Sequence, residues 1–192
     1  MFKLKTDQTN NEILKKYRID QAFGCYTRNA LEMEIWPTVK DDVRFVVFAD
    51  VDDMRVANKR FGYTRTDHKI RKAIAAREED IVVARWYSGD ELVFFLMDGP
   101  RMGDPVLYAQ RIQERMHEVG LFATFGIAEL PRGRKIQLKS AVGRASDLVR
   151  KSKARGIKNC ILTEAMTFED STQSGFFSRL WKTVSAKFLP AA

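Results

Sequence analysis

Two apolar runs separated by a short polar turn constrain the fold of this chain more than any other feature. Residues 81–87 (IVVARWY) and 92–97 (LVFFLM) are rich in β-branched and aromatic side chains, and Ser-Gly-Asp-Glu lies between them. This pattern predicts a β-hairpin. Acidic residues are poor strand formers, so Asp90 and Glu91 beside an apolar strand have two explanations. They either keep a charged turn soluble or present carboxylates to a metal ion.

The rest of the chain predicts a sheet covered by helices. Residues 43–51 (VRFVVFADV) have the composition of a strand buried on both faces. Further strands are predicted at 121–130 and 160–163, and helices at 9–18, 27–36 (ended by Pro37), 56–77 (interrupted near Gly62), 105–119 and 137–155. The β-α-β-β-α-β core is the ferredoxin-like arrangement. We therefore expect an α+β fold, an α/β sandwich of the palm type. Its central sheet is mostly antiparallel, the hairpin carries the acidic turn, and helices lie on the sheet faces.

Length and charge limit the organisation and the partners. The 192 residues suffice for one domain with a core, which we divide into a leading helix (1–19), a main domain (20–163) and a C-terminal tail (164–192). The net charge of +8 favours anionic partners. Aromatic side chains do not alternate with the basic ones as a nucleic-acid stacking surface needs, so no specific nucleic acid is expected. No apolar run reaches the roughly 20 residues that span a bilayer, and no signal peptide is evident. We expect a cytoplasmic protein.

The tail contains an amphipathic stretch at 175–192. Its aromatic and aliphatic residues fall on one helical face, and its Arg and Lys residues lie elsewhere. Such a helix packs on its own domain or on a partner subunit, or it lies on the surface of an anionic membrane. Both alternatives stay open.

Asp50 and Asp52 stand two residues apart at the end of the buried strand. Side chains two apart on an extended chain leave the same face, which brings two negative charges together unless a cation or water screens them. If the strands share a sheet, the hairpin also brings Asp90 toward Asp50. Mg²⁺ in proteins is typically held by one or two carboxylates together with substrate phosphates. The alternative is that Asp50, Asp52 and Asp53 only cap the helix that follows.

On these motifs, residues 20–162 resemble the GGDEF family, the diguanylate cyclases of bacterial signalling. The signature turn is Ser88-Gly89-Asp90-Glu91-Leu92, and the segments DQAFGCYTR, DVDDMRVANK, GYTRTD and SKARG resemble four further family motifs. Positions that these four segments retain are Asp20, Gly24, Arg28, Asp50, Asp52, Asn58, Gly62, Asp67, Lys153 and Gly156. Departures from the family pattern are Met54, Lys59, Tyr63 and Thr66 near the substrate, Ser88 in the signature, and Ile157 where an Arg is common.

The resemblance implies a two-metal active site. Asp50, Asp90 and the backbone carbonyl of Val51 would bind two Mg²⁺ or Mn²⁺ ions per site. Glu91 would assist deprotonation of a ribose 3′-hydroxyl or stabilise the metal-bound pocket.

The resemblance also implies the substrate and the reaction. Asn58 and Asp67 would bind the guanine edge of GTP. The other substrate-binding positions are Lys153 on the terminal phosphates, and Asp52, Met54 and Arg55 in the loop around the triphosphate. Two GTP molecules would form cyclic di-GMP when a 3′-oxygen attacks an α-phosphorus and pyrophosphate leaves. Because each domain holds one GTP, the enzyme would act as a homodimer.

Two other functions stay open. The changes around the base leave open a different cyclic-dinucleotide synthase, similar to the minimal CRISPR polymerases, whereas the retained Asn58 and Asp67 favour guanine. The second alternative is a degenerate domain that binds GTP or a protein partner without turnover. The intact Asp50, Asp90 and Glu91 argue against it.

Overall fold

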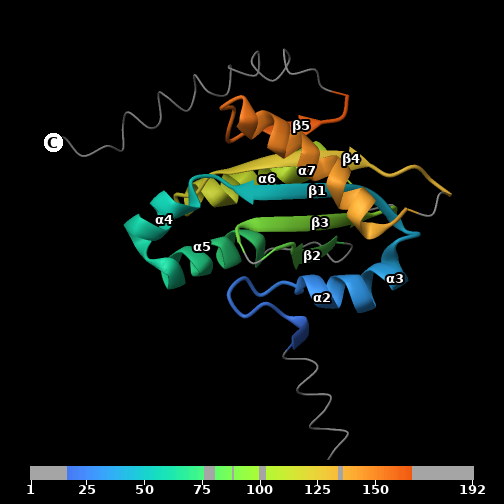
Figure 1. Cartoon of the computed structure of the whole chain (residues 1–192), viewed down its shortest axis with the longest axis horizontal. Coiled ribbons are helices and arrows are strands. Elements are labelled where there is room, and N and C mark those ends of the chain that lie inside the picture. Colours follow the sequence, from blue (N-terminus) through green and yellow to red (C-terminus); the bar gives the residue numbers. More distant parts are fainter. Residues whose placement is uncertain (1–16, 76–80, 88, 100–102, 134–135, 166–192) are drawn as a thin grey trace, which may run out of the picture.

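A mixed sheet forms the centre of the molecule (Figure 1). The computed structural model describes residues 17–75, 81–87, 89–99, 103–133 and 136–165. Within these residues the strands are β1 (Val43–Val51), β2 (Ile81–Arg85), β3 (Glu91–Met97), β4 (Ala123–Glu129) and β5 (Ile161–Thr163). Their order is β2-β3-β1-β4-β5, with β4 and β5 parallel and the other neighbours antiparallel. This confirms the predicted α+β fold, including the ferredoxin-like order of the first four strands.

β2 and β3 form the predicted hairpin. Arg85 pairs with Leu92 in the ladder, and the amide of Trp86 donates to the carbonyl of Glu91 at 2.9 Å. β3 begins at Glu91, so Glu91 belongs to the strand and Asp90 to the turn. β1 lies between β3 and β4, and residues 46–49 are buried, as its unbroken apolar run predicted.

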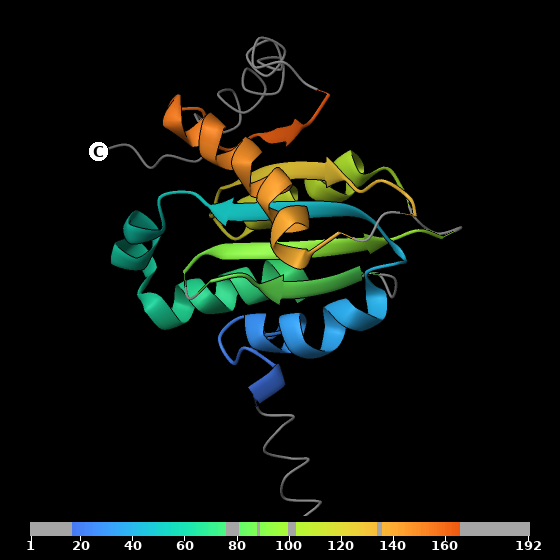
Figure 2. The ribbon, with the colours of Figure 1, turned by 45° about the vertical axis from the view of Figure 1, so that its right-hand side comes forward.

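Helices cover both faces of the sheet (Figure 2). One face carries α7 (Leu138–Ala154) and a continuous helical segment made of α2 (Arg28–Ala30), the π-turn η1 (Leu31–Ile35) and α3 (Trp36–Val39). The other face carries α5 (Tyr63–Ala75) and α6 (Pro105–Glu118), and α4 (Met54–Phe61) lies beyond the end of β1. Successive strand residues serve opposite faces. Phe94 therefore packs in the core under α5 and α6, whereas Phe95 packs in the core under α7.

Helix α7 lies very close to β4. A Cβ atom at Gly126 would lie 2.1 Å from the carbonyl oxygen of Ala145, so a larger residue does not fit unless the helix moves. The last turn of the same helix carries Lys153, which reaches the end of β1. The place of Lys153 therefore depends on this close contact.

One predicted helix boundary is wrong. The helix predicted at 27–36 does not end at Pro37 but continues to Val39. A π-turn over Leu31–Ile35 precedes Pro37, which sits in the first turn of α3, where a missing amide hydrogen matters little. The break near Gly62 is confirmed, because Gly62 has a φ of 83° between α4 and α5.

Two predicted segments fall beyond the described ranges. The leading helix at 9–18 lies outside them except for residues 17 and 18, and the tail lies outside them from residue 166 onward. Within the described ranges, no helix combines the length and the apolar character needed to cross a membrane.

Candidate active site at the end of the central strand

Three acidic residues converge where β1 ends beside the hairpin turn. Asp50 pairs with Glu91 across the β1–β3 ladder, and the amide of Val51 donates to the carbonyl of Asp90 at 3.2 Å. The sheet thus joins the two acidic clusters that are far apart in the sequence, as the strand and hairpin patterns predicted.

Lys153 contacts two carboxylates of this end of the sheet. Its Nζ atom is 2.8 Å from Oδ1 of Asp50 and 2.8 Å from Oδ1 of Asp52. Both side chains therefore leave the same side of the chain, as their spacing predicted. The ammonium group provides the positive charge that two adjacent carboxylates need when they are taken out of water.

Asp52 is buried, and protein groups surround its carboxylate. Its side chain is 2% exposed. Thr124 Oγ1 lies 2.9 and 3.0 Å from the two carboxylate oxygens, and the amide of Asn159 donates to Oδ2 at 2.9 Å. Asn159 has a φ of 54°, a left-handed conformation that Asn tolerates better than most residues.

The sequence analysis did not single out Thr124 or Asn159. A polar residue within the apolar run LFATFGIAEL is the signal that would have indicated Thr124, because a buried hydroxyl needs a hydrogen-bond partner. No comparable signal marks Asn159, whose contribution to Asp52 is its backbone amide.

Capping of α4 does not explain the acidic cluster. Asp53 is the residue at the N-terminal cap, with a φ of 51°, but its side chain makes no capping hydrogen bond. Its carboxylate instead lies 2.6 Å from Nζ of Lys158, and both side chains are exposed. Asp52 faces Lys153 and Thr124.

Burial changes the proton affinity of the site. It is the largest cause of the raised pKa of Asp50, to which the charges of Asp90 and Asp52 add while Lys153 opposes. Burial also raises the pKa of Glu91, followed by the charges of Asp50 and Asp90. Burial lowers the pKa of Lys153, but hydrogen bonds to Asp50 and Asp52 outweigh it, so that pKa is raised. The site holds more negative charge than Lys153 offsets.

Glu91 gives a second indication that the site suits a cation. Its Oε2 atom is buried and has no hydrogen-bond partner among the described residues. Carboxylate and carbonyl oxygens are the ligands that Mg²⁺ and Mn²⁺ prefer. In the described part of the chain, no group of three or more His, Cys, Asp or Glu side chains is arranged to hold a metal ion. A metal ion at Asp50, Asp90 and Glu91 would therefore need further oxygen ligands, such as those of a substrate phosphate.

The positions predicted to bind the nucleotide lie mainly on α4, beyond the end of β1, and on the N-terminal part of α5 (Figure 1). Asn58 and Asp67 are half-buried, and Oδ1 of Asn58 is buried with no partner among the described residues. Arg55 is exposed. Met54 packs against the core, which suits a structural role better than a contact with substrate.

Arg85 holds the hairpin turn in place. Its Nε and Nη2 atoms donate to the carbonyl of Gly89 at 3.0 and 2.7 Å, and Nη1 donates to Asp20 Oδ2 at 3.0 Å. Asp20 also accepts from the amides of Ala22 and Phe23. The first residues of the main domain therefore support the turn that carries Asp90.

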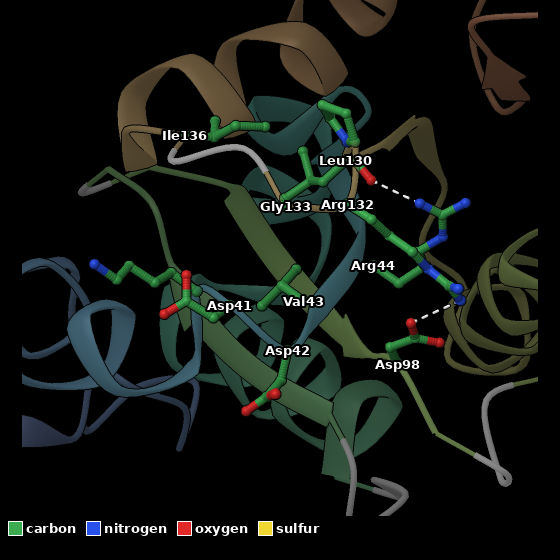
Figure 3. A pocket seen from close by; sticks show the side chains of 11 residues that line it. Asp41, Asp42, Val43, Arg44, Asp98, Leu130, Arg132, Gly133 and Ile136 are labelled. Carbon is green, nitrogen blue, oxygen red and sulfur yellow. Dashed lines mark hydrogen bonds and ion pairs between the residues drawn. The ribbon is translucent and has the colours of Figure 1, made fainter.

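A hollow of about 490 Å³ lies at the opposite end of the sheet, where β1 begins and β3 and β4 end (Figure 3). Its arginines have partners: Arg132 lies 2.8 Å from Asp98, and Arg44 donates to the carbonyl of Leu130 at 2.8 Å. None of the predicted site residues lines it.

Solved structures share this architecture. The coiled coil and GGDEF domain of DgcB from Caulobacter crescentus, in complex with c-di-GMP, aligns with a TM-score of 0.65 and 16% identity, over 83% of this chain and 92% of that one. The diguanylate cyclase SiaD from Pseudomonas aeruginosa, in complex with its activator SiaC, aligns with a TM-score of 0.63 and 18% identity, over 83% and 67% of the two chains. The chain has the fold of GGDEF domains.

The GGDEF fold is kept here at low sequence similarity. An S helix-GGDEF-EAL structure of LapD from Vibrio cholerae, bound to c-di-GMP, aligns with a TM-score of 0.63 and 14% identity, over 86% of this chain and 41% of that one. No protein-family model matches the chain, and no curated protein matches it by sequence. The likeness establishes the GGDEF fold, while the chemistry has to follow from the residues of this chain.

Proposed function

We propose that this chain is a diguanylate cyclase that condenses two GTP molecules into cyclic di-GMP and two pyrophosphates. The observation that carries the proposal is the β1–β3 register, which pairs Asp50 with Glu91 and puts Asp90 in the adjoining turn. Lys153 lies beside these acids. An acidic cluster with a lysine at the mouth of a GGDEF hairpin suits a polyphosphate that carries a divalent cation. In support, SiaD is a diguanylate cyclase and DgcB was solved with c-di-GMP.

The residues of the site would have separate tasks. When bound, Mg²⁺ or Mn²⁺ would neutralise phosphate charge and lower the pKa of the attacking 3′-hydroxyl. Asp50, Asp90 and the carbonyl of Val51 would hold two such ions. Glu91, whose pKa is raised by burial and by its acidic neighbours, is suited to accept the proton of the 3′-hydroxyl. Lys153 would hold phosphate oxygens as a point charge.

The base and the second nucleotide complete the proposed complex. Asn58 has a buried side-chain oxygen without a partner among the described residues, which is available to accept a hydrogen bond from guanine. Asp67 would accept from the same edge of the base, and the exposed Arg55 is available to the triphosphate. Because each domain would hold one GTP, two copies would face each other as a homodimer. We include a protein or membrane contact of the tail as a further proposal, since its amphipathic pattern suits either surface.

A degenerate domain that binds GTP without turnover is the second candidate. Two observations favour it. Lys153 is paired with Asp50 rather than directed toward open solvent, and Tyr63, which stands in place of a family His, is 76% exposed. A pairing of this kind competes with a cation for Asp50.

Product formation from single nucleotides separates the candidates. Purified protein with Mg²⁺ is incubated with labelled GTP or labelled ATP, and the products are resolved by chromatography. We expect a cyclic dinucleotide from GTP. A product from ATP would indicate the alternative synthase of the CRISPR polymerase type, and GTP binding without product would indicate the degenerate domain.

A matched pair of variants tests the metal assignment. Asp90 and Asp98 flank β3 at its two ends, so Asp90→Ala and Asp98→Ala make the same change at the proposed site and at the distant hollow. We expect Asp90→Ala to lower turnover by about a hundredfold or more and Asp98→Ala to leave it unchanged. Equal rates for the two variants would contradict the assignment of Asp90.

A further inference from the structure

Asp50 and Asp52 both contact Lys153 but differ in their exposure and in their other hydrogen-bond partners. The side chain of Asp50 is 23% exposed, and Lys153 is the partner that its carboxylate contacts at 2.8 Å. The side chain of Asp52 is 2% exposed and receives hydrogen bonds from Thr124 and Asn159 in addition to the contact with Lys153. Asp50 is therefore the more accessible of the two carboxylates, whereas hydrogen bonds from the protein fix the position of Asp52.

The hydrogen bonds that fix Asp52 connect to two further elements. Thr124 belongs to β4, and its Oγ1 also accepts from the amide of Asn159 at 3.0 Å. The side-chain oxygen of Asn159 lies 2.7 Å from Nε2 of His117 and accepts from Gln113 Nε2 at 3.3 Å, both on α6. These hydrogen bonds hold the buried carboxylate of Asp52 in one orientation.

A divalent cation at Asp50 changes the surroundings of Lys153. Without a cation, the ammonium group of Lys153 contacts Asp50 and Asp52, and the charges of Asp90 and Glu91 lie close to Asp50. A divalent cation bound at Asp50 would repel that ammonium group at short range. Lys153 then needs another carboxylate, or it leaves the site where phosphate oxygens would arrive.

We propose that Asp52 is a positioning residue, a fixed counter-charge that retains Lys153 when a cation takes Asp50. The inference rests on the proposed function, because it assumes that a divalent cation binds Asp50. It assigns to Asp52 a task different from a contact with substrate: Asp52 acts through Lys153, and Thr124 and the amide of Asn159 act through Asp52.

Cation binding without nucleotide tests the first part. Mn²⁺ is titrated into the full chain, and free Mn²⁺ is measured by its electron paramagnetic resonance signal. Asp52→Asn leaves Lys153 with Asp50 alone, so we expect Mn²⁺ to bind about tenfold more weakly. Asp53→Asn is the matched control, since Asp53 is the next residue and has its own exposed lysine partner, Lys158. It should leave Mn²⁺ binding unchanged.

A double-mutant cycle separates the lysine from the charge of Asp52 itself. In a Lys153→Met background no ammonium group competes for Asp50, so Asp52→Asn should weaken Mn²⁺ binding by about threefold or less. If Asp52→Asn weakens binding equally in both backgrounds, Asp52 acts only through its own charge and the proposal is overturned.

The reactivity of Lys153 gives a readout that needs no metal. Acetylation of each lysine by acetic anhydride is followed by mass spectrometry. A paired, protonated amine reacts slowly, so we expect Lys153 to stay protected in Asp50→Asn and to react about threefold faster or more in Asp52→Asn. Unchanged protection in Asp52→Asn overturns the inference.

The two readouts distinguish the inference from the proposed function. If the unchanged chain binds no Mn²⁺ but the labelling pattern holds, the metal proposal fails and the hold of Asp52 on Lys153 stands. If Asp52→Asn does not fold, as judged by its thermal transition, Thr124→Val takes its place. That variant removes one donor to Asp52, and it should change the labelling of Lys153 in the same direction by a smaller factor.

Discussion

The two ends of the central sheet both gather charged side chains, but they differ in how those charges are compensated. At the distant end, Arg132 and Asp98 form an ion pair whose side chains are 72% and 40% exposed, and Arg44 donates to the carbonyl of Leu130 (Figure 3). Arg44 is also paired with Glu129. At the other end, Lys153 contacts Asp50 and Asp52, Asp90 and Glu91 add negative charge beside them, and burial raises the pKa of Asp50 and Glu91.

The comparison teaches that clustered charge alone does not mark a candidate site, and that buried charge without compensation by the protein is a more specific signal. The distant hollow is about 490 Å³ and is lined by six charged residues, yet its arginines have close partners in the protein. The end with the candidate site carries more negative charge than Lys153 offsets, and a buried oxygen of Glu91 lacks a partner among the described residues. Such surplus charge is costly unless a ligand uses it.

The largest expected effect comes from the helix that connects the two ends. Gly126→Ala puts a Cβ atom 2.1 Å from the carbonyl oxygen of Ala145, so α7 must move away from β4. We expect the free energy of unfolding, measured by urea denaturation, to fall by about 3 kcal/mol. Gly143→Ala is the control on the same helix, where an added Cβ meets no atom within 4 Å, and it should be neutral or stabilising. Equal stabilities would show that α7 is not held by this contact.

An effect of intermediate size is expected when the negative charge of Glu91 is removed. The pKa of Glu91 is raised in the folded protein by burial and then by Asp50 and Asp90. The protonated Glu91 side chain therefore contributes its full stability below the ordinary glutamate pKa. That stability is lost as the pH rises through the raised pKa of Glu91 in the folded protein. Without divalent cations, Glu91→Gln should match the unchanged chain near pH 4 and melt about 2 °C higher at pH 7.5. A lower melting temperature for the variant at pH 7.5 would mean that the carboxylate is already compensated.

The smallest effect is expected at the distant end. Asp98→Asn removes the partner of Arg132, but the pair is exposed and water screens it. The free energy of unfolding should change by less than about 0.5 kcal/mol, measured by urea denaturation at low salt. A loss several times larger would show that the distant charges are as strongly coupled to the fold as those around Asp50, and the contrast between the ends would disappear.

Much of the fold followed from the sequence because its patterns are local. The apolar run at 43–51 and the hairpin at 81–97 specify strands by their own composition. Gly62 indicated the break between the helices because glycine adopts a positive φ without strain, and the structure has one there. The failure at Pro37 has a physical cause. A π-turn ahead of the proline lets the helix continue, and nothing in the local sequence announces that turn.

The site was predictable in part. The acidic residues could be predicted because they lie beside apolar strands, where charged side chains are unexpected. The contact of Lys153 with Asp50 and Asp52 depends on how α7 lies across the sheet, and the hydrogen bonds from Thr124 and Asn159 depend on where β4 and the segment before β5 meet. These are tertiary distances, which spacing along the chain does not encode.

The contact between Lys153 and the carboxylates of Asp50 and Asp52 has a consequence for folding. Because Lys153 belongs to the chain itself, its ammonium group is present whenever the chain folds. The acidic end of β1 can therefore fold before a metal ion binds from solution. Proteins whose folding free energy comes from metal binding unfold when a chelator removes the metal. This chain should keep its secondary structure in a chelator, since the ammonium group of Lys153 already neutralises part of the acidic charge.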